Sequence, residues 1–291
     1  MVHLPKFYWL LTCVLNSIVA VHGLNEQGFA SWANTDTESS TASLWLESLL
    51  GSDFPRARIL TYTYEVGRDD HRLRDLDALS SSAVNLTEIL AEDRQQTGAD
   101  RRPLFFVAHS LGGWIVKRAL VLSLESDSPA IRNLEGSSCG VVFFGTISPS
   151  RRSSPSNVAN VIRRTTSLTE SDKNRQKSPI SDLQDGDFEW LERQMEVFKG
   201  ITANLPILSF YETQETGEGF IAEQQHSMKG SDGKQIALSA NHMDLIKFHG
   251  RDSNYELFIN NFSIMAGEDA IDKLLESKRR LFGSSSSEFY N

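Results

Sequence analysis

The sequence predicts an α/β protein with a mostly parallel sheet and helices on both faces. Short, very apolar runs alternate with longer segments of helical pattern along most of the chain. Several of these runs are apolar at every position, as expected of strands that are buried on both faces. The length of 291 residues, of which 40% are hydrophobic, suits one medium-sized domain.

Six segments are predicted as strands because they are short and rich in apolar, β-branched or aromatic residues. In chain order they cover residues 18–21, 58–64, 104–108, 140–144, 206–211 and the weaker 235–239. Helices are predicted where apolar residues recur every three or four positions, as do Leu79, Ala83, Leu86 and Leu90. The predicted helices cover residues 41–51, 76–94, 111–124, 188–198, 243–264 and 268–281.

One long insertion interrupts this alternation. Residues 147–204 separate two predicted strands and are far longer than an ordinary crossover. They form either a cap over a site or a surface excursion without a role in binding, and both alternatives stay open. The chain therefore divides into a lead-in over 1–17, a domain over 18–265, and a C-terminal helix with a disordered tail over 266–291. Within that last part, the tail covers residues 283–291.

The N-terminus can be interpreted in two ways. Residues 7–21 are largely apolar and follow Lys6, which is typical of a secretory leader and would also allow membrane association. A cut near Ala20 would destroy the strand predicted over 18–21, however, and would leave Cys139 as the only thiol. We therefore expect an intracellular, cytoplasmic protein, with secretion or membrane association as the alternative.

Charge and cysteine content exclude several classes of function. The 38 acidic and 29 basic residues give a net charge of −9, which repels phosphate backbones and argues against nucleic-acid binding. The two cysteines, Cys13 and Cys139, cannot form a disulfide framework and lack the spacing of a zinc site. The sequence implies no metal and no organic cofactor.

The segment over 103–117 contains the strongest candidate nucleophile. A strand runs directly into AHSLG (108–112), and a helix follows at once, which is the setting of a nucleophile elbow. Ser110 would be the nucleophile, and the backbone N–H of Leu111 would face a developing oxyanion. The turn needs small residues on both sides, which Gly112 satisfies and Ala108 satisfies less well. The alternative is a serine that caps a structural helix.

Leu24 and His242 are the candidates for the second oxyanion donor and the base. Leu24 follows the first strand and Gly23, where a backbone N–H can approach a substrate, although an ordinary glycine turn is an equal alternative. The base should follow the acid in the chain, which leaves three histidines. His242 directly follows the last strand, whereas His249 falls inside a predicted helix and His226 in a polar loop without a preceding strand.

Glu212 is the candidate acid because it ends the strand predicted over 206–211. It follows Ser110 and precedes His242 in the chain, as the order of nucleophile, acid and base requires. The alternative is a solvated loop carboxylate, since the loop that follows is acidic. Asp244 lies too close to His242 in sequence to reach around to its ring.

These segments together resemble a known family. The chain is similar to the serine esterase/lipase-like α/β-hydrolases, in particular to fungal lipase-like domains found ahead of NACHT-type signalling modules. The resemblance covers about residues 18–265 and rests on IVAVHGL (18–24), FPRARILTYTY (54–64), FFVAHSLGGWIVKRAL (105–120), GVVFFGT (140–146), LPILSFYET (205–213) and SANHMDLIKF (239–248). We expect a lone hydrolase domain, without a NACHT or repeat module after residue 285.

The resemblance implies an α/β-hydrolase fold and a triad of Ser110, Glu212 and His242. The expected reaction is hydrolysis of a carboxylic ester, from a lipid or a secondary metabolite, or of a thioester, through an acyl-enzyme. The chain departs from the family at Ala108, at the loop over 147–150 and at Asn241, where the family has Gly, Pro-His-Arg-Gly and Asp. The alternative is a catalytically silent signalling or binding module that keeps the fold.

Overall fold

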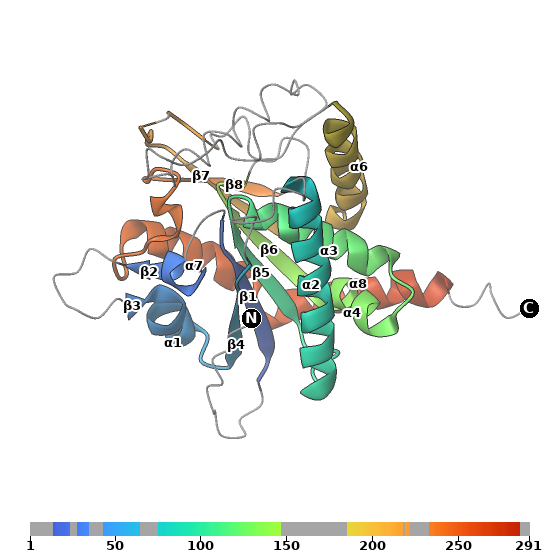
Figure 1. Cartoon of the computed structure of the whole chain (residues 1–291). Helices are drawn as coiled ribbons and strands as arrows, with labels where there is room; N and C mark the ends of the chain where they lie inside the picture. Colours follow the sequence, from blue (N-terminus) through green and yellow to red (C-terminus); the bar gives the residue numbers. More distant parts are fainter. Residues whose placement is uncertain are drawn as a thin grey trace, which may run out of the picture.

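A single parallel sheet organises the computed structural model, which describes residues 14–23, 28–34, 43–64, 75–146, 185–217, 219–221 and 233–285. Its six strands lie in the order β4-β1-β5-β6-β7-β8, and every neighbouring pair is parallel (Figure 1). They are β1 (Asn16–Val21), β4 (Ala57–Tyr62), β5 (Leu104–His109), β6 (Ser138–Phe144), β7 (Ile207–Glu212) and β8 (Lys234–Leu238). The predicted parallel sheet is confirmed.

Helices cover both faces of this sheet. In Figure 1, α2 and α3 lie side by side over one face, whereas α7 lies on the other side. The long helices are α2 (Asp75–Gln96), α3 (Gly112–Glu125), α4 (Pro129–Ser137), α6 (Asp185–Thr202), α7 (Ser253–Met265) and α8 (Glu268–Ser285). The shorter elements are η1 (Gly28–Trp32), η2 (Leu46–Leu50), α1 (Gly51–Asp53), η4 (Asp244–Ile246), and the antiparallel pair β2 (Ala33–Asn34) and β3 (Ser43–Leu44).

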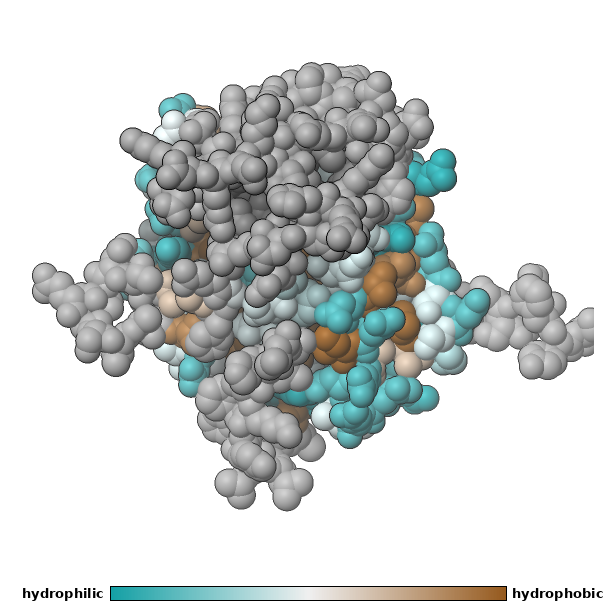
Figure 2. Space-filling view, viewed as in Figure 1, coloured by the Kyte–Doolittle hydropathy of each residue, from teal (hydrophilic) through white to brown (hydrophobic). Residues whose placement is uncertain are grey.

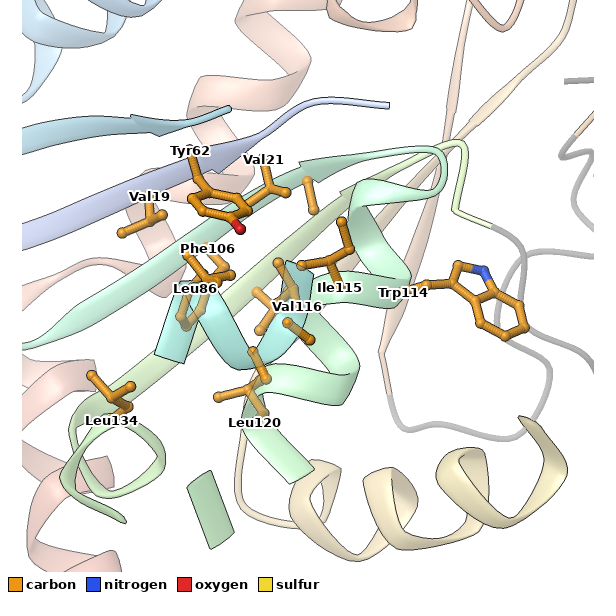
Figure 3. Packing of buried hydrophobic residues seen from close by; sticks show 14 of the residues in the cluster. Val19, Val21, Tyr62, Leu86, Phe106, Trp114, Ile115, Val116, Leu120 and Leu134 are labelled. Atoms are coloured by element: carbon orange, nitrogen blue, oxygen red, sulfur yellow. The ribbon is translucent and has the colours of Figure 1, made fainter. Parts of the chain in front are cut away.

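Two apolar clusters on opposite faces explain why the strands are apolar at every position. Along β5, Leu104 and Phe106 belong to the cluster beneath α2 and α3, while Phe105 belongs to the cluster beneath α7. Successive side chains of a strand point to opposite faces, so a strand covered on both sides needs apolar residues throughout. Figure 3 shows the first cluster, in which Leu86 and Ile115 pack from the helices onto the strands.

The helix predicted over 41–51 is wrong at its start. Leu44 pairs with Ala33 in the β2–β3 ladder, and the helical residues are those of η2 and α1. Trp45 precedes η2 and is fully buried, and its indole N–H donates to the Ile246 carbonyl at 2.7 Å. This long-range contact fixes the entry to the helix, and no local periodicity reveals it.

The single helix predicted over 243–264 is also wrong. It consists of η4 and α7, separated by irregular chain that contains His249. Gly250 has a φ of 108°, which an α-helix cannot contain. Asp252 then caps α7 by accepting from the Tyr255 N–H at 2.7 Å. His249 therefore does not lie inside a helix, contrary to the prediction, and α4 is a helix that was not predicted.

The N-terminal apolar segment contributes a buried strand. Residues 16–21 form β1, which is hydrogen-bonded to β4 on one side and to β5 on the other. The strand begins two residues earlier than predicted, inside the expected lead-in over 1–17, and residues 1–13 lie outside the described residues. Among the helices that the structure describes, none is both long enough and apolar enough to cross a membrane.

The surface in Figure 2 alternates between hydrophilic and hydrophobic areas where the structure describes it. The brown, hydrophobic areas on this face are small and are separated by teal, hydrophilic residues. Scattered apolar residues of this kind are normal on a protein surface and indicate no particular partner.

The insertion predicted over 147–204 contains α6 at its C-terminal end, and residues 147–184 lie outside the described residues. Helix α6 packs on α3, where Arg118 donates to the Gln194 side chain at 2.6 Å. The buried Lys117 ammonium lies 4.8 Å from the Phe143 ring centroid and 5.8 Å from that of Phe198 on α6. Burial lowers the pKa of Lys117 to about 7.

Helix α8 closes the described chain and reaches further than predicted. It runs to residue 285, so residues 283–285 are helical rather than part of a disordered tail, and residues 286–291 lie outside the described residues. The buried Lys278 ammonium donates to the Glu135 carboxylate at 2.7 Å and to its carbonyl at 2.6 Å. This pair fixes α8 to α4.

Candidate active site

Ser110 stands in a tight turn between β5 and α3. Its φ is 50°, and among the described residues it is the one non-glycine residue with a positive φ. Such a conformation typically costs about 1–3 kcal/mol and persists only where surrounding contacts hold it. The Ser110 N–H donates to the Phe144 carbonyl at 2.9 Å, and the Thr146 hydroxyl donates to the Ser110 carbonyl at 3.1 Å. Ser110 is therefore held in the strained turn by the last residue of β6 and by the segment that follows it.

The glycines after Ser110 allow β1 and α3 to approach each other closely. A Cβ on Gly112 would lie 2.2 Å from the His22 carbonyl oxygen, and one on Gly113 would lie 2.2 Å from the Thr146 hydroxyl. Both distances are too short for any side chain. On the strand side, the methyl group of Ala108 is fully buried in the core, so the fold accommodates an alanine at this position.

The structure brings the other two predicted side chains to Ser110. His242 Nε2 lies 3.0 Å from Ser110 Oγ, and His242 Nδ1 lies 2.8 Å from Glu212 Oε2. Both are hydrogen-bond distances. The residues come from the carboxyl end of β5, the end of β7 and the loop after β8. Because parallel strands end at the same edge of the sheet, three distant segments meet there.

All three side chains are withdrawn from solvent. Ser110, Glu212 and His242 are 3%, 1% and 0% exposed. The second oxygen of Glu212, Oε1, accepts a hydrogen bond from the Ile221 backbone N–H. A buried carboxylate requires such partners, and the two bonds together fix its plane relative to the imidazole.

Two of the competing residues are described, and both have other surroundings. The carboxylate of Asp244 accepts from the Asn241 amide at 2.7 Å, and Asn241 Oδ1 in turn accepts from the Met243 N–H at 3.0 Å. His249 is exposed in the irregular segment before α7. His226 lies outside the described residues.

One of the two predicted oxyanion donors is described. Leu111 is the N-cap residue of α3, so its N–H stands at the positive end of the helix dipole, next to Ser110. Leu24 lies outside the described residues. The chain just before it is fixed, because the Tyr64 hydroxyl donates to the His22 carbonyl at 3.0 Å and the two rings stack at 4.5 Å.

Several residues that position this cluster were not singled out from the sequence. His109, Thr146 and Ile221 each make a hydrogen bond to one of the three central residues or to its backbone. His109 precedes the candidate serine, so its position in the sequence could have marked it as part of the site. Nothing in the sequence around Ile221 could have done so. No group of three or more His, Cys, Asp or Glu residues in the described ranges could hold a metal ion.

A parallel six-stranded sheet with a strained serine after a central strand defines the α/β-hydrolase fold. The peroxisomal α/β-hydrolase Lpx1 of Saccharomyces cerevisiae has a similar structure, with a TM-score of 0.50 over 96% of this chain and 87% of that chain. The two sequences are 11% identical, so the likeness shows the fold alone. No protein-family model matches the chain.

Among curated proteins, the chain is similar to protein SERAC1. It is 25% identical to the Mus musculus protein over 251 residues, which are 81% of this chain and 36% of that protein. It is 23% identical to the Homo sapiens protein over 275 residues, which are 89% of this chain and 40% of that protein. The chain thus spans about two fifths of the length of these relatives. The resemblance to domains that precede NACHT modules stays a prediction.

Proposed function

We propose that the protein is a serine hydrolase that cleaves a carboxylic ester or thioester through an acyl-enzyme. The observation that carries the proposal is the continuous hydrogen-bonded series from Ser110 through His242 to Glu212. The capping alternative has less support, because the N-cap of α3 is Leu111 and the Ser110 hydroxyl instead lies against His242. A structural serine needs neither a left-handed backbone nor a buried imidazole–carboxylate pair.

The geometry supports one tautomer of the base. The Glu212 carboxylate accepts a hydrogen bond from His242 Nδ1. The ring therefore carries its hydrogen on Nδ1 and presents the Nε2 lone pair to Ser110 Oγ. In the first step Oγ attacks the substrate carbonyl carbon, and its proton passes to Nε2. The Glu212 carboxylate stabilises the imidazolium, while the Leu111 N–H, with that of Leu24 as the proposed second donor, stabilises the oxyanion.

The remaining steps return the enzyme to its starting state. The proton on His242 Nε2 passes to the leaving alcohol or thiol as the bond between the carbonyl carbon and that group breaks. A water molecule then attacks the acyl-Ser110 ester while His242 takes one of its protons. Collapse of this second intermediate releases a carboxylic acid, and the proton returns to Ser110 Oγ. The three buried side chains act at low dielectric, where their interactions are strong.

The substrate we propose is a small-molecule or lipid ester, including an ester or thioester of secondary metabolism. The net charge of −9 disfavours polyanionic substrates such as nucleic acids. We also propose an intracellular location, because a leader cut near Ala20 would remove β1, which has hydrogen-bonded neighbours on both sides in the sheet. N-terminal sequencing of protein purified from its host tests this, and a mature chain that begins after Leu24 would contradict it.

Labelling with a fluorophosphonate probe tests the proposed nucleophile. We expect one probe per folded wild-type molecule, none on Ser110→Ala, and full labelling of Ser48→Ala, a matched control at an exposed serine of η2. Circular dichroism should be the same for all three. Hydrolysis by Ser110→Ala should fall by several orders of magnitude, about 10⁶ in the best-studied triad. Undiminished labelling of Ser110→Ala would show that another residue is the nucleophile. A folded wild type that neither reacts nor turns over esters would support a silent module.

A further inference from the structure

We infer that His109 is a positioning residue that fixes the main chain of the proposed base, His242; this rests on the proposed function. His109 Nε2 lies 3.0 Å from the His242 carbonyl oxygen, although the two residues are 133 positions apart in the sequence. The two rings lie 5.0 Å apart, and both residues are at most 1% exposed. His109 is the last residue of β5, so the bond joins the strand that presents the nucleophile to the segment that presents the base.

The base needs such an anchor because of where its segment lies in the sheet. His242 follows β8, the edge strand, and β6 and β7 separate β8 from β5. The backbone bonds just before His242 lead to the end of β7: the Ala240 carbonyl accepts from Thr213 at 3.2 Å and from Gln214 at 3.1 Å. These bonds fix the base relative to Glu212. The His109 bond crosses both intervening strands and fixes the base relative to Ser110.

The chemistry of the contact defines what His109 supplies. A carbonyl oxygen only accepts, so Nε2 of His109 must carry a hydrogen and donate it. A neutral imidazole does this without adding charge. That matters because His242 becomes an imidazolium during the reaction, and a second cation 5.0 Å from it would oppose that step. His109 thus orients the base through the Nε2 N–H donor, acting on its backbone rather than on the reacting atoms.

Two substitutions separate the donor from the bulk of the ring. His109→Gln places an amide N–H near the former Nε2 position, whereas His109→Met fills similar space without a donor. We expect kcat of His109→Met to fall about 10- to 100-fold, because displacements near 1 Å cost about 10² in rate. KM should stay within a factor of about two, since the ground-state contacts of the substrate remain. His109→Gln should retain most of the wild-type kcat, and the control His249→Met, at an exposed histidine, all of it.

The rates must be referred to competent sites, so that loss of folded protein does not imitate the effect. Fluorophosphonate stoichiometry counts the sites, and the probe's second-order rate constant should fall in His109→Met in proportion to kcat. If His109→Met does not fold, His109→Asn replaces it, because its shorter amide cannot reach the carbonyl. The inference about His109 would be overturned if His109→Met had the same kcat per site as the wild type. It would also be overturned if His109→Gln lost as much kcat as His109→Met. Either result would leave the proposed function standing. A folded wild type that neither labels nor turns over esters would overturn the proposed function as well.

Discussion

Substituting Gly112 by alanine should disturb both stability and activity, because this position is where β1 meets α3. The new Cβ would lie 2.2 Å from the His22 carbonyl oxygen and 2.6 Å from that of Val21. Ordinary van der Waals contact begins near 3.4 Å. Both obstacles are backbone atoms at the end of β1 and just after it, so no side-chain rotation relieves the clash. The end of β1 and the first turn of α3 must therefore separate by more than 1 Å.

The expected cost follows from two opposing effects. Overpacking a rigid site typically costs about 1–3 kcal/mol, and a clash between two backbone segments belongs at the upper end. Alanine recovers at most about 1 kcal/mol of helix propensity over glycine. We therefore expect Gly112→Ala to lower the free energy of unfolding by about 2 kcal/mol. The same movement displaces the Leu111 N–H relative to the loop after Gly23 and should lower kcat about 10²-fold.

Urea denaturation followed by circular dichroism measures the stability change, and the fluorophosphonate labelling rate measures the state of the site. The matched control is Gly136→Ala in α4, where the nearest atom to the new Cβ would be Asn133 Oδ1 at 3.8 Å. That substitution should instead stabilise the protein by about 0.5–1 kcal/mol. The close approach of β1 and α3 would be refuted if Gly112→Ala matched Gly136→Ala in stability and labelled at the wild-type rate.

Three further perturbations have defined outcomes. Glu212→Gln should lower kcat by about 10⁴, because the amide favours the wrong imidazole tautomer. This loss is smaller than that expected for Ser110→Ala. Wild-type turnover of Glu212→Gln in an ester assay would remove Glu212 from the mechanism. Burial lowers the pKa of Lys117 to about 7, so between about pH 7 and 10.5 the unfolded chain binds more protons and stability rises with pH. Relative to Lys117→Met, the wild-type free energy of unfolding should rise by about 2 kcal/mol from pH 7 to 9 in urea titrations, and equal slopes would contradict the burial of a titrating amine. Deleting residues 1–13 should leave a folded protein. Deleting residues 1–21 should abolish soluble yield, because β1 has hydrogen-bonded neighbours on both sides. A folded product of the longer deletion would show that the sheet does not require β1.

The strands and the meeting of the site residues could be predicted because their signals are local. Strands buried on both faces must be apolar at every position, and a nucleophile turn needs small residues at fixed offsets. Chain order then selected Glu212 and His242, since the ends of parallel strands gather at one edge. Their hydrogen-bond distances to each other and to Ser110 agree with that selection. Whether these residues catalyse a reaction is a separate question that the proposed labelling addresses.

The elements that were predicted wrongly depend on a distant contact at η2 and on local backbone signals before α7. The start of η2 is fixed by the hydrogen bond from Trp45 to the Ile246 carbonyl, and these residues are 201 positions apart. The break before α7 combines the positive φ of Gly250 with the Asp252 cap, and the apolar spacing around it masks both. The Ile221 N–H reaches Glu212 through its backbone, so no residue type at that position could have indicated it.

The position of β8 at the edge of the sheet has a consequence for how the protein would lose activity. In the described structure this strand has a hydrogen-bonded neighbour on one side, β7, and three of its five residues are exposed or half-buried. Edges of this kind open locally at a lower free energy than the centre of a sheet. Such an opening would carry His242 away from Ser110 while β1, β5 and β6 stay paired. Thermal inactivation of the proposed hydrolase would then begin in a molecule that is still almost entirely native, below the temperature at which its helices melt.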